Sequence, residues 1–257
     1  MALFIAGLFV ASCFVTGTPI TRALIAFVPL VALMCGVEFM ADARNNLRSR
    51  ERWRIRRATK FAVPLLDGVL NIFLHAMLAS IALLILLHPQ SSDYFLRESL
   101  RLGAGATLLY ASAAMIATTV TLLFLAAGYS LPVVHRHPVA ARSVEEFWAR
   151  RWNITVSAWL HAFVFLPLAR RRRVALGIML AFLVSGAMHG WLVLSALGPW
   201  AAFTATLFFV IQGVVVLVEN RLRIQTWPVP LARAWTVIII LGTSPLFIDP
   251  GLRLFGL

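Results

Sequence analysis

The sequence predicts an all-α protein that crosses a membrane several times, and three observations carry this prediction. Of its 257 residues, 61% are hydrophobic and only 13% are charged, whereas soluble domains are usually about 45–50% apolar and about 25% charged. The mean hydropathy is +0.87. Several apolar runs approach the roughly 20 residues that span a bilayer, so we expect about seven to eight transmembrane helices. They are expected to form a single membrane-embedded domain over residues 1–257.

The expected spans are separated by short polar or basic loops. In order, they cover residues 2–16, 20–40, 61–88, 102–127, 174–196, 200–218 and 234–248. The first is interpreted as a retained span, because it lacks the positive region and small-residue cleavage site of a signal peptide. A further apolar stretch, residues 153–168, is short and is followed by four arginines, 170–173. We expect a re-entrant or interfacial helix there, since a spanning helix would place those arginines outside.

The formal net charge of +13 comes mainly from the loops. Nineteen of the 23 lysines and arginines fall in four loops assigned to the cytoplasmic side, as the positive-inside rule requires. Topology and anionic lipid therefore explain the charge, and no nucleic-acid partner is expected. Cys13 and Cys35 lie in apolar runs without a CxxC pair, so neither a disulfide framework nor a metal site is indicated.

A histidine lies deep in one of these spans. His189 follows Val174 by fifteen residues, which is roughly 22 Å along a helix. Neutral imidazole accepts a proton from a hydroxyl near neutral pH, and Ser185 lies one turn earlier, where it could orient the ring. The alternative is packing alone: Gly186 and Gly190 form a GxxxG motif, and the histidine would then only bond a neighbouring helix.

Asn153 begins the short apolar stretch. One interpretation is a helix N-cap, for which asparagine is among the best residues. The other is an amide that stabilises a developing oxyanion or orients a base. Ser143 and Glu146 have the spacing of a capping box, which predicts an amphipathic helix at the cytoplasmic interface just before Asn153.

Basic and aromatic residues flank this apolar stretch. They bind either lipid headgroups or the phosphates of a carrier such as coenzyme A. The candidates for binding such a carrier are Arg150, Arg151, Trp152, Arg170 and Arg171.

A rival constellation lies in the span 61–88. Asp67, Asn71 and His75 are four residues apart and share one helical face. They form either the proton relay of a small proton-coupled transporter or a structural polar seam. The sequence shows no internal repeat of the kind found in many transporters. His161 is interpreted as a packed or interfacial histidine.

Glu38 and Glu219 lie near the ends of expected spans. We expect both side chains at the membrane interface.

Two segments together resemble the membrane-bound O-acyltransferase (MBOAT) superfamily, in its wax synthase-like branch. Residues 143–153, SVEEFWARRWN, are similar to the signature around the asparagine of that branch, and residues 182–189, FLVSGAMH, to the signature around its histidine. The signature region spans residues 143–190. One departure is Gly190, where plant-type members commonly have an acidic residue.

This resemblance implies an MBOAT-like fold and a function. An acyl group would pass from acyl-CoA to the hydroxyl of a lipophilic alcohol, either in wax ester synthesis or in acetylation of a terpenoid or other specialised alcohol. His189 would be the essential histidine and Asn153 its partner. Acyl-CoA would be a co-substrate reaching a multi-pass membrane protein from the cytoplasm, with no permanently bound cofactor.

Overall fold

The computed structural model describes residues 2–45, 56–57, 62–88, 92–131 and 133–257. These residues are almost entirely helical, which confirms the all-α class. The exception is a short antiparallel pairing of β1 (Arg56–Arg57) with β2 (Tyr129–Ser130). The chain divides into two compact units, one of residues 1–49 and 135–256, the other of residues 50–134 and Leu257. The single domain over residues 1–257 stays a prediction.

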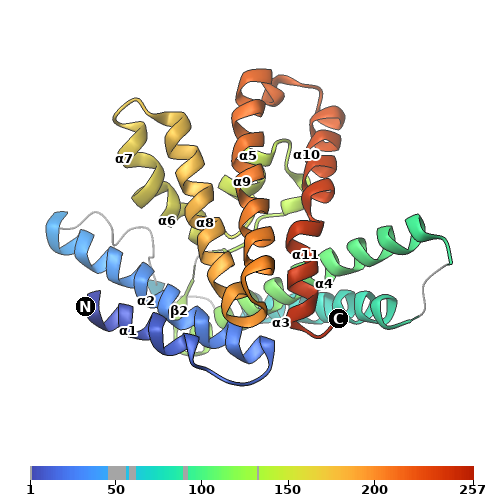
Figure 1. Cartoon of the computed structure of the whole chain (residues 1–257), viewed down its shortest axis with the longest axis horizontal. Coiled ribbons are helices and arrows are strands. Elements are labelled where there is room, and N and C mark those ends of the chain that lie inside the picture. Colours follow the sequence, from blue (N-terminus) through green and yellow to red (C-terminus); the bar gives the residue numbers. More distant parts are fainter. Residues whose placement is uncertain (1, 46–55, 58–61, 89–91, 132) are drawn as a thin grey trace. The chain divides into compact units, whose positions relative to one another are not determined.

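The first unit holds most of the helices (Figure 1). Its longer helices are α1 (Ala2–Cys13), α2 (Pro19–Asn45), α8 (Val174–Leu197), α9 (Pro199–Leu222), α10 (Val229–Thr243) and α11 (Pro245–Leu254). Its short helical segments are η2 (Pro138–Ala140), α5 (Val144–Glu146), α6 (Ile154–Leu160), α7 (Leu166–Ala169) and η5 (Ile224–Thr226), with two π-helical turns, η3 (Phe147–Arg151) and η4 (His161–Phe165).

Helices α8 and α9 form an antiparallel hairpin at the centre of this unit, and they lie side by side in Figure 1. Gly198 makes the turn between them with a φ of +92°, a conformation that favours glycine. Small residues then let the two helices approach closely. A Cβ at Gly213 of α9, for example, would lie 3.0 Å from the Cβ of Phe182 on α8.

The segment that precedes α8, residues 144–169, is sharply bent and is called the bent segment. Val144–Arg151 and Ile154–Ala169 are inclined by 99° to each other. The bend lies at Trp152, which is extended, and at Asn153, whose φ is +40°. Asparagine is one of the few residues other than glycine that adopt this left-handed conformation.

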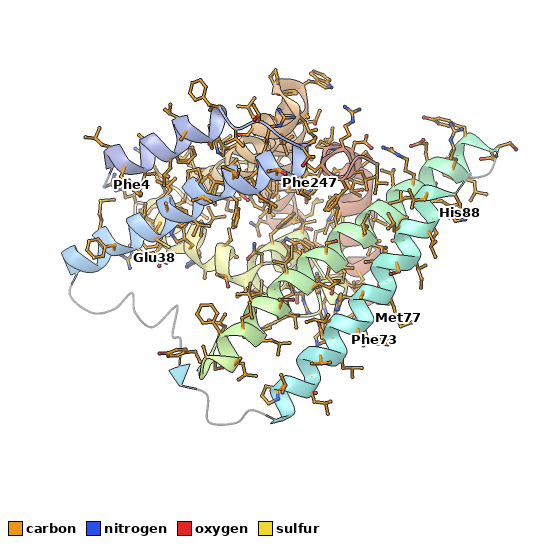
Figure 2. All side chains as sticks on the ribbon, turned by 90° about the horizontal axis from the view of Figure 1, so that it is seen from below. Phe4, Glu38, Phe73, Met77, His88 and Phe247 are labelled. Atoms are coloured by element: carbon orange, nitrogen blue, oxygen red, sulfur yellow. The ribbon has the colours of Figure 1, made fainter. Side chains whose placement is uncertain are left out.

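The second unit is built on α3 (Ala62–Leu87) and α4 (Tyr94–Ala126), which pack side by side in both figures. Helix α4 begins earlier than the predicted residue 102, because the Asp93 side chain caps it by accepting a hydrogen bond of 2.8 Å from the Leu96 amide. Phe73 and Met77 lie on the side of α3 that faces away from α4 (Figure 2), and they are exposed, as expected of a lipid-facing surface.

A multi-pass membrane protein is supported, and the count of seven to eight spans stays a prediction. Among the described residues, five helices are long and apolar enough to cross a membrane, or up to seven if each of two bent pairs is one span. These five cover residues 19–40, 64–87, 94–126, 174–197 and 199–222. The predicted segment 2–16 is a shorter helix. Most of the basic loop 41–60 lies outside the described residues.

The predicted span 234–248 is wrong in one respect. It is broken at Ser244 into α10 and α11, which are inclined by 52°. Pro245 occupies the first position of α11, where its missing N–H costs nothing, but it cannot continue the hydrogen bonding of α10.

Candidate functional site

His189 lies on α8 with one ring nitrogen already bonded. Its Nδ1 is 2.8 Å from the main-chain carbonyl oxygen of Ser185. A carbonyl only accepts, so Nδ1 donates and Nε2 keeps its lone pair. Ser185 thus orients the ring, as predicted, and it does so through its backbone carbonyl. The ring also stacks on Phe209 with 4.4 Å between centroids, and it meets the edge of Phe247 at 5.5 Å.

This tautomer does not by itself mark a functional histidine. His75 and His88 make the same contact, each with the carbonyl four residues earlier in its own helix. His189, in addition, lines a cavity.

The cavity has a volume of about 490 Å³ and mostly apolar walls. One face of α8 supplies Val174, Ile178, Ala181, Phe182, Ser185 and His189. The bent segment supplies Glu145, Trp148, Ala149, Arg150, Trp152, Asn153, Val156, Ser157, Leu160, His161 and Phe165, and α9 supplies Val216 and Asn220. The lining stretch of α8 is fifteen residues long, roughly 22 Å, so the cavity is elongated along this helix.

Asn153 lines the same cavity and is also the N-cap of α6. Its Oδ1 accepts a hydrogen bond of 3.4 Å from the Val156 amide, and its own amide donates to His135 Nδ1 at 3.3 Å. The capping interpretation is therefore confirmed. Within the described part of the chain, the side-chain nitrogen of Asn153 has no hydrogen-bond partner, so the amide keeps donors for a ligand.

The bent segment begins with a fully satisfied helix terminus. The Ser143 hydroxyl accepts from the Glu146 amide at 2.9 Å, as the capping-box spacing predicts. The Glu146 carboxylate, however, reaches back to the Arg142 amide at 2.8 Å and not to the N-cap residue. The two remaining amides, of Val144 and Glu145, donate to a carboxylate from α9.

That carboxylate is Glu219, for which an interfacial position stays a prediction. Glu219 is completely buried. It accepts from the Val144 amide at 2.8 Å, the Glu145 amide at 3.1 Å and Trp235 Nε1 at 2.8 Å. An anion at a helix N-terminus is stabilised by these unpaired N–H groups and by the helix dipole. Glu219 therefore ties α9 and α10 to the bent segment.

Gln212 provides a second tie two turns earlier on α9. It is also fully buried. Its Oε1 accepts from Trp148 Nε1 at 3.2 Å, while its Nε2 donates to Thr243 Oγ1 at 2.8 Å. Trp148, a wall of the cavity, is held in this way. The sequence drew attention to Glu219 but not to its partners, and Gln212 was missed. The signal for Gln212 was a polar side chain within a strongly apolar helix, which requires partners.

The predicted donor-binding residues divide into two groups. Arg150 and Trp152 line the cavity. Arg151 does not, because its guanidinium binds Glu146 at 2.7 Å and the carbonyl groups of two residues in the 135–137 segment. Arg170 and Arg171 are exposed beside the α7–α8 turn and lie outside the cavity walls. A role in donor binding stays a prediction for all five.

Glu146 lies outside the five helices that are long enough to cross a membrane. Burial raises the pKa of its carboxyl group, but hydrogen bonds with the Arg142 amide and the Arg151 guanidinium outweigh this effect and hold the pKa below its usual value. The Glu146–Arg151 pair therefore stays ionised at neutral pH and stabilises the bent segment.

His161, expected to be a packed or interfacial residue, is exposed and lines the cavity.

The rival constellation on α3 is largely engaged in contacts within its own unit. Asn71 accepts a hydrogen bond of 3.0 Å from Thr118 of α4, and the His75 ring lies 5.5 Å from that of Tyr110. These contacts fit the polar-seam interpretation. Over the described ranges, no group of three His, Cys, Asp or Glu residues could hold a metal ion.

Comparison with known proteins points to one family. Residues 131–211 match the profile described as "Membrane bound O-acyl transferase family". The chain is 33% identical over 147 residues to "Probable long-chain-alcohol O-fatty-acyltransferase 3" of Arabidopsis thaliana, covering 51% of this chain and 43% of that protein. It is 34% identical over 100 residues to "Long-chain-alcohol O-fatty-acyltransferase" of Simmondsia chinensis, covering 36% and 28%.

The longest of these matches is to "Probable long-chain-alcohol O-fatty-acyltransferase 9" of Arabidopsis thaliana, which is 29% identical over 189 residues and covers 65% of this chain and 55% of that protein. The chain thus spans about half the length, or less, of the curated relatives it matches. The resemblance to wax synthase-like membrane-bound O-acyltransferases is confirmed, and the matched region contains both Asn153 and His189.

Proposed function

We propose that this chain, whose residues 131–211 match the membrane-bound O-acyltransferase family, transfers an acyl group from a thioester donor to the hydroxyl of a lipophilic alcohol. One observation carries the proposal. Asn153 and His189 come from two separate signature segments and line the same cavity. A base and an amide donor facing one apolar space are the groups that acyl transfer to an alcohol requires.

In the first step His189 acts as the general base. Its Nε2 has a free lone pair, because Nδ1 donates to the Ser185 carbonyl. Nε2 takes the proton from the alcohol while the alcohol oxygen attacks the carbonyl carbon of the thioester. A tetrahedral intermediate forms with negative charge on the former carbonyl oxygen. The imidazolium is held in place by the Ser185 carbonyl and the stacked Phe209 ring.

In the second step the intermediate collapses. The carbon–sulfur bond breaks, the carbonyl reforms as an ester, and the thiolate takes the proton from His189. The Asn153 amide would donate a hydrogen bond to the oxyanion. Removal of one such donor typically lowers the rate by about 10²–10³-fold.

The substrates follow from the cavity and from the named relatives. Long apolar walls suit an alkyl chain, and the relatives are named as acyltransferases of long-chain alcohols. We infer acyl-CoA as the donor, since Arg150 at the cavity could pair with a phosphate. The donor would arrive from the cytoplasm, where the basic loops are expected.

Ester formation in isolated membranes tests the proposal. Labelled palmitoyl-CoA or acetyl-CoA is supplied with a panel of lipophilic alcohols, to wild type and to His189→Ala in parallel. We expect a labelled ester from wild type only, with equal amounts of both proteins in the membrane. The preferred donor separates wax ester synthesis from acetylation of a specialised alcohol.

Undiminished ester synthesis by His189→Ala would rule out the mechanism. The alternative of a proton-coupled transporter using Asp67, Asn71 and His75 is favoured by no specific observation. Asn71 and His75 both contact α4.

A further inference from the structure

The turn of α8 that carries His189 packs closely against α9, because Gly186 and Gly190 contribute no side chain to the contact. A Cβ at Gly186 would lie 3.0 Å from the Thr206 carbonyl oxygen and 3.1 Å from the Phe209 Cβ. A Cβ at Gly190 would overlap the Thr206 hydroxyl oxygen. Thr206 therefore lies against Gly186 and Gly190, which are one helical turn apart and leave no room for a side chain.

The Thr206 hydroxyl crosses from one helix to the other. It donates a hydrogen bond of 3.2 Å to the Gly186 carbonyl. Most threonines in these helices bond instead to their own backbone: Thr107 to Gly103, Thr121 to Ala117, Thr204 to Ala201 and Thr236 to Ala232. The Thr206 contact thus joins two helices where a local bond is the usual alternative.

We propose that Thr206 is a positioning residue for His189. The inference rests on the proposed function of His189 as the base. Thr206 holds the α8 backbone at Gly186, next to the Ser185 carbonyl that binds His189 Nδ1. Phe209, one turn further along α9, stacks on the imidazole ring. Helix α9 therefore fixes both the backbone that carries the ring and the plane of the ring.

This arrangement also accounts for glycine at position 190. A Cβ at this position would overlap the Thr206 hydroxyl oxygen, so α9 already fills the space beside the α8 backbone. The turn that carries the histidine is thus held by a contact from the neighbouring helix. Small displacements matter, because misplacing a catalytic group by about 1 Å can lower the rate by about 10²-fold.

The test compares two variants of Thr206 with a matched control. Thr206→Val keeps the shape but removes the donor, Thr206→Ser keeps the donor, and Thr204→Val removes a hydroxyl that bonds within α9. In the ester assay we expect kcat of Thr206→Val to fall by about 10- to 100-fold with KM nearly unchanged. Thr206→Ser and Thr204→Val should retain wild-type kcat. A loss shared by Thr204→Val, or no rescue by Thr206→Ser, would overturn the proposal.

A second pair of variants tests the steric part. Gly190→Ala should lower kcat, because its new methyl group meets the Thr206 hydroxyl. Adding Thr206→Ala should remove this clash, so that kcat of the double variant equals that of Thr206→Ala alone, which lacks the positioning hydroxyl. A double variant with a lower kcat than Thr206→Ala alone would overturn this steric part of the proposal.

A measurement that does not depend on ester formation separates the positioning role of Thr206 from the proposed function. Carbethoxylation of His189 by diethyl pyrocarbonate, followed by mass spectrometry, reports how its free Nε2 is presented to the cavity. We expect the modification rate to change in Thr206→Val and to stay at the wild-type value in Thr204→Val. An unchanged rate in Thr206→Val would overturn the positioning role even if no ester were formed by any variant. Ester formation absent from wild type would contradict the proposed function alone.

Discussion

At the scale of single residues, Asn153 combines two functions that can be separated. Its oxygen caps α6, while its amide nitrogen is the candidate oxyanion donor. Aspartate caps a helix as well as asparagine does, and it also tolerates the left-handed backbone. It has no amide donor, however, and it adds a negative charge beside the developing oxyanion.

We therefore expect Asn153→Asp to remain folded and to lose about 10²–10³-fold in kcat. Asn153→Gly serves as the companion variant, because glycine suits a φ of +40° but provides neither cap nor donor. Thermal unfolding and ester formation are measured on both. If Asn153→Asp kept wild-type activity, the residue would be a cap and nothing more.

The sequence identifies His189 and Asn153 but not the residues that hold them. Both stand out because a polar side chain in an apolar helix is costly. The resemblance of the two signature segments then implies that these two residues act together. Glu219 meets the same criterion, yet its partners Val144 and Glu145 are 75 and 74 residues away in the sequence. Thr206 gives no signal at all, since a threonine in a helix usually bonds to its own backbone.

At the scale of elements, the bent segment depends on a carboxylate from another helix. Glu219→Gln replaces an acceptor of three hydrogen bonds with a group that has only one oxygen. Each amide left unpaired in a buried site costs about 1–3 kcal/mol. We expect the free energy of unfolding to fall by about that amount, with a lower midpoint in thermal unfolding in detergent.

Glu98→Gln is the matched control for this substitution. Glu98 forms a half-exposed pair with Arg101 on α4 at 3.4 Å, and such pairs contribute about 0–1 kcal/mol. Equal loss of stability in the two variants would show that the buried carboxylate has no special role in capping the bent segment.

Element positions follow from the apolar runs, whereas their ends and breaks do not. The hairpin of α8 and α9 lies close to the predicted residues 174–196 and 200–218. Helix α4 starts at Tyr94 because a single capping side chain decides its start. The two π-helical turns could not be predicted, since they depend on contacts with other segments.

At the scale of the molecule, the bent segment starts and finishes at one end of the α8–α9 hairpin. Its first residue, Val144, is bonded to Glu219 near the end of α9, and its last turn leads through Arg170–Arg173 into the start of α8. The α7–α8 and α9–α10 connections both lie at the upper end in Figure 1. This geometry fits the re-entrant helix predicted for residues 153–168.

Single-cysteine variants test that topology. With a membrane-impermeant maleimide, we expect Arg142→Cys, Arg171→Cys and Arg221→Cys to react from the cytoplasmic side, because all three lie at the same end of the hairpin. Trp200→Cys, at the start of α9, should react only from the opposite side. Labelling of Arg142→Cys and Arg171→Cys from opposite sides would show that residues 153–168 span the membrane.

The number of spans was the least predictable property of the whole chain. Composition identifies an apolar run but not its bends, which are 52° at Pro245 and 99° at Asn153. Such a bend decides whether the run crosses the membrane once or re-enters on the same side. Such bends depend on single residues with unusual backbone geometry. Hydropathy averaged over a window does not detect them.

Helix α8 meets three environments around its circumference, and this has a consequence for natural variation. Gly186 and Gly190 should admit no replacement, because α9 fills the space beside them. Leu183 and Leu194 are exposed and should accept almost any apolar residue. Ala181 and Phe182 line the cavity, and changes there should alter which substrates are used. A saturation library of this helix should therefore yield a tolerance profile that repeats with each helical turn. Variants with an altered preference for substrate chain length should be confined to the positions that line the cavity.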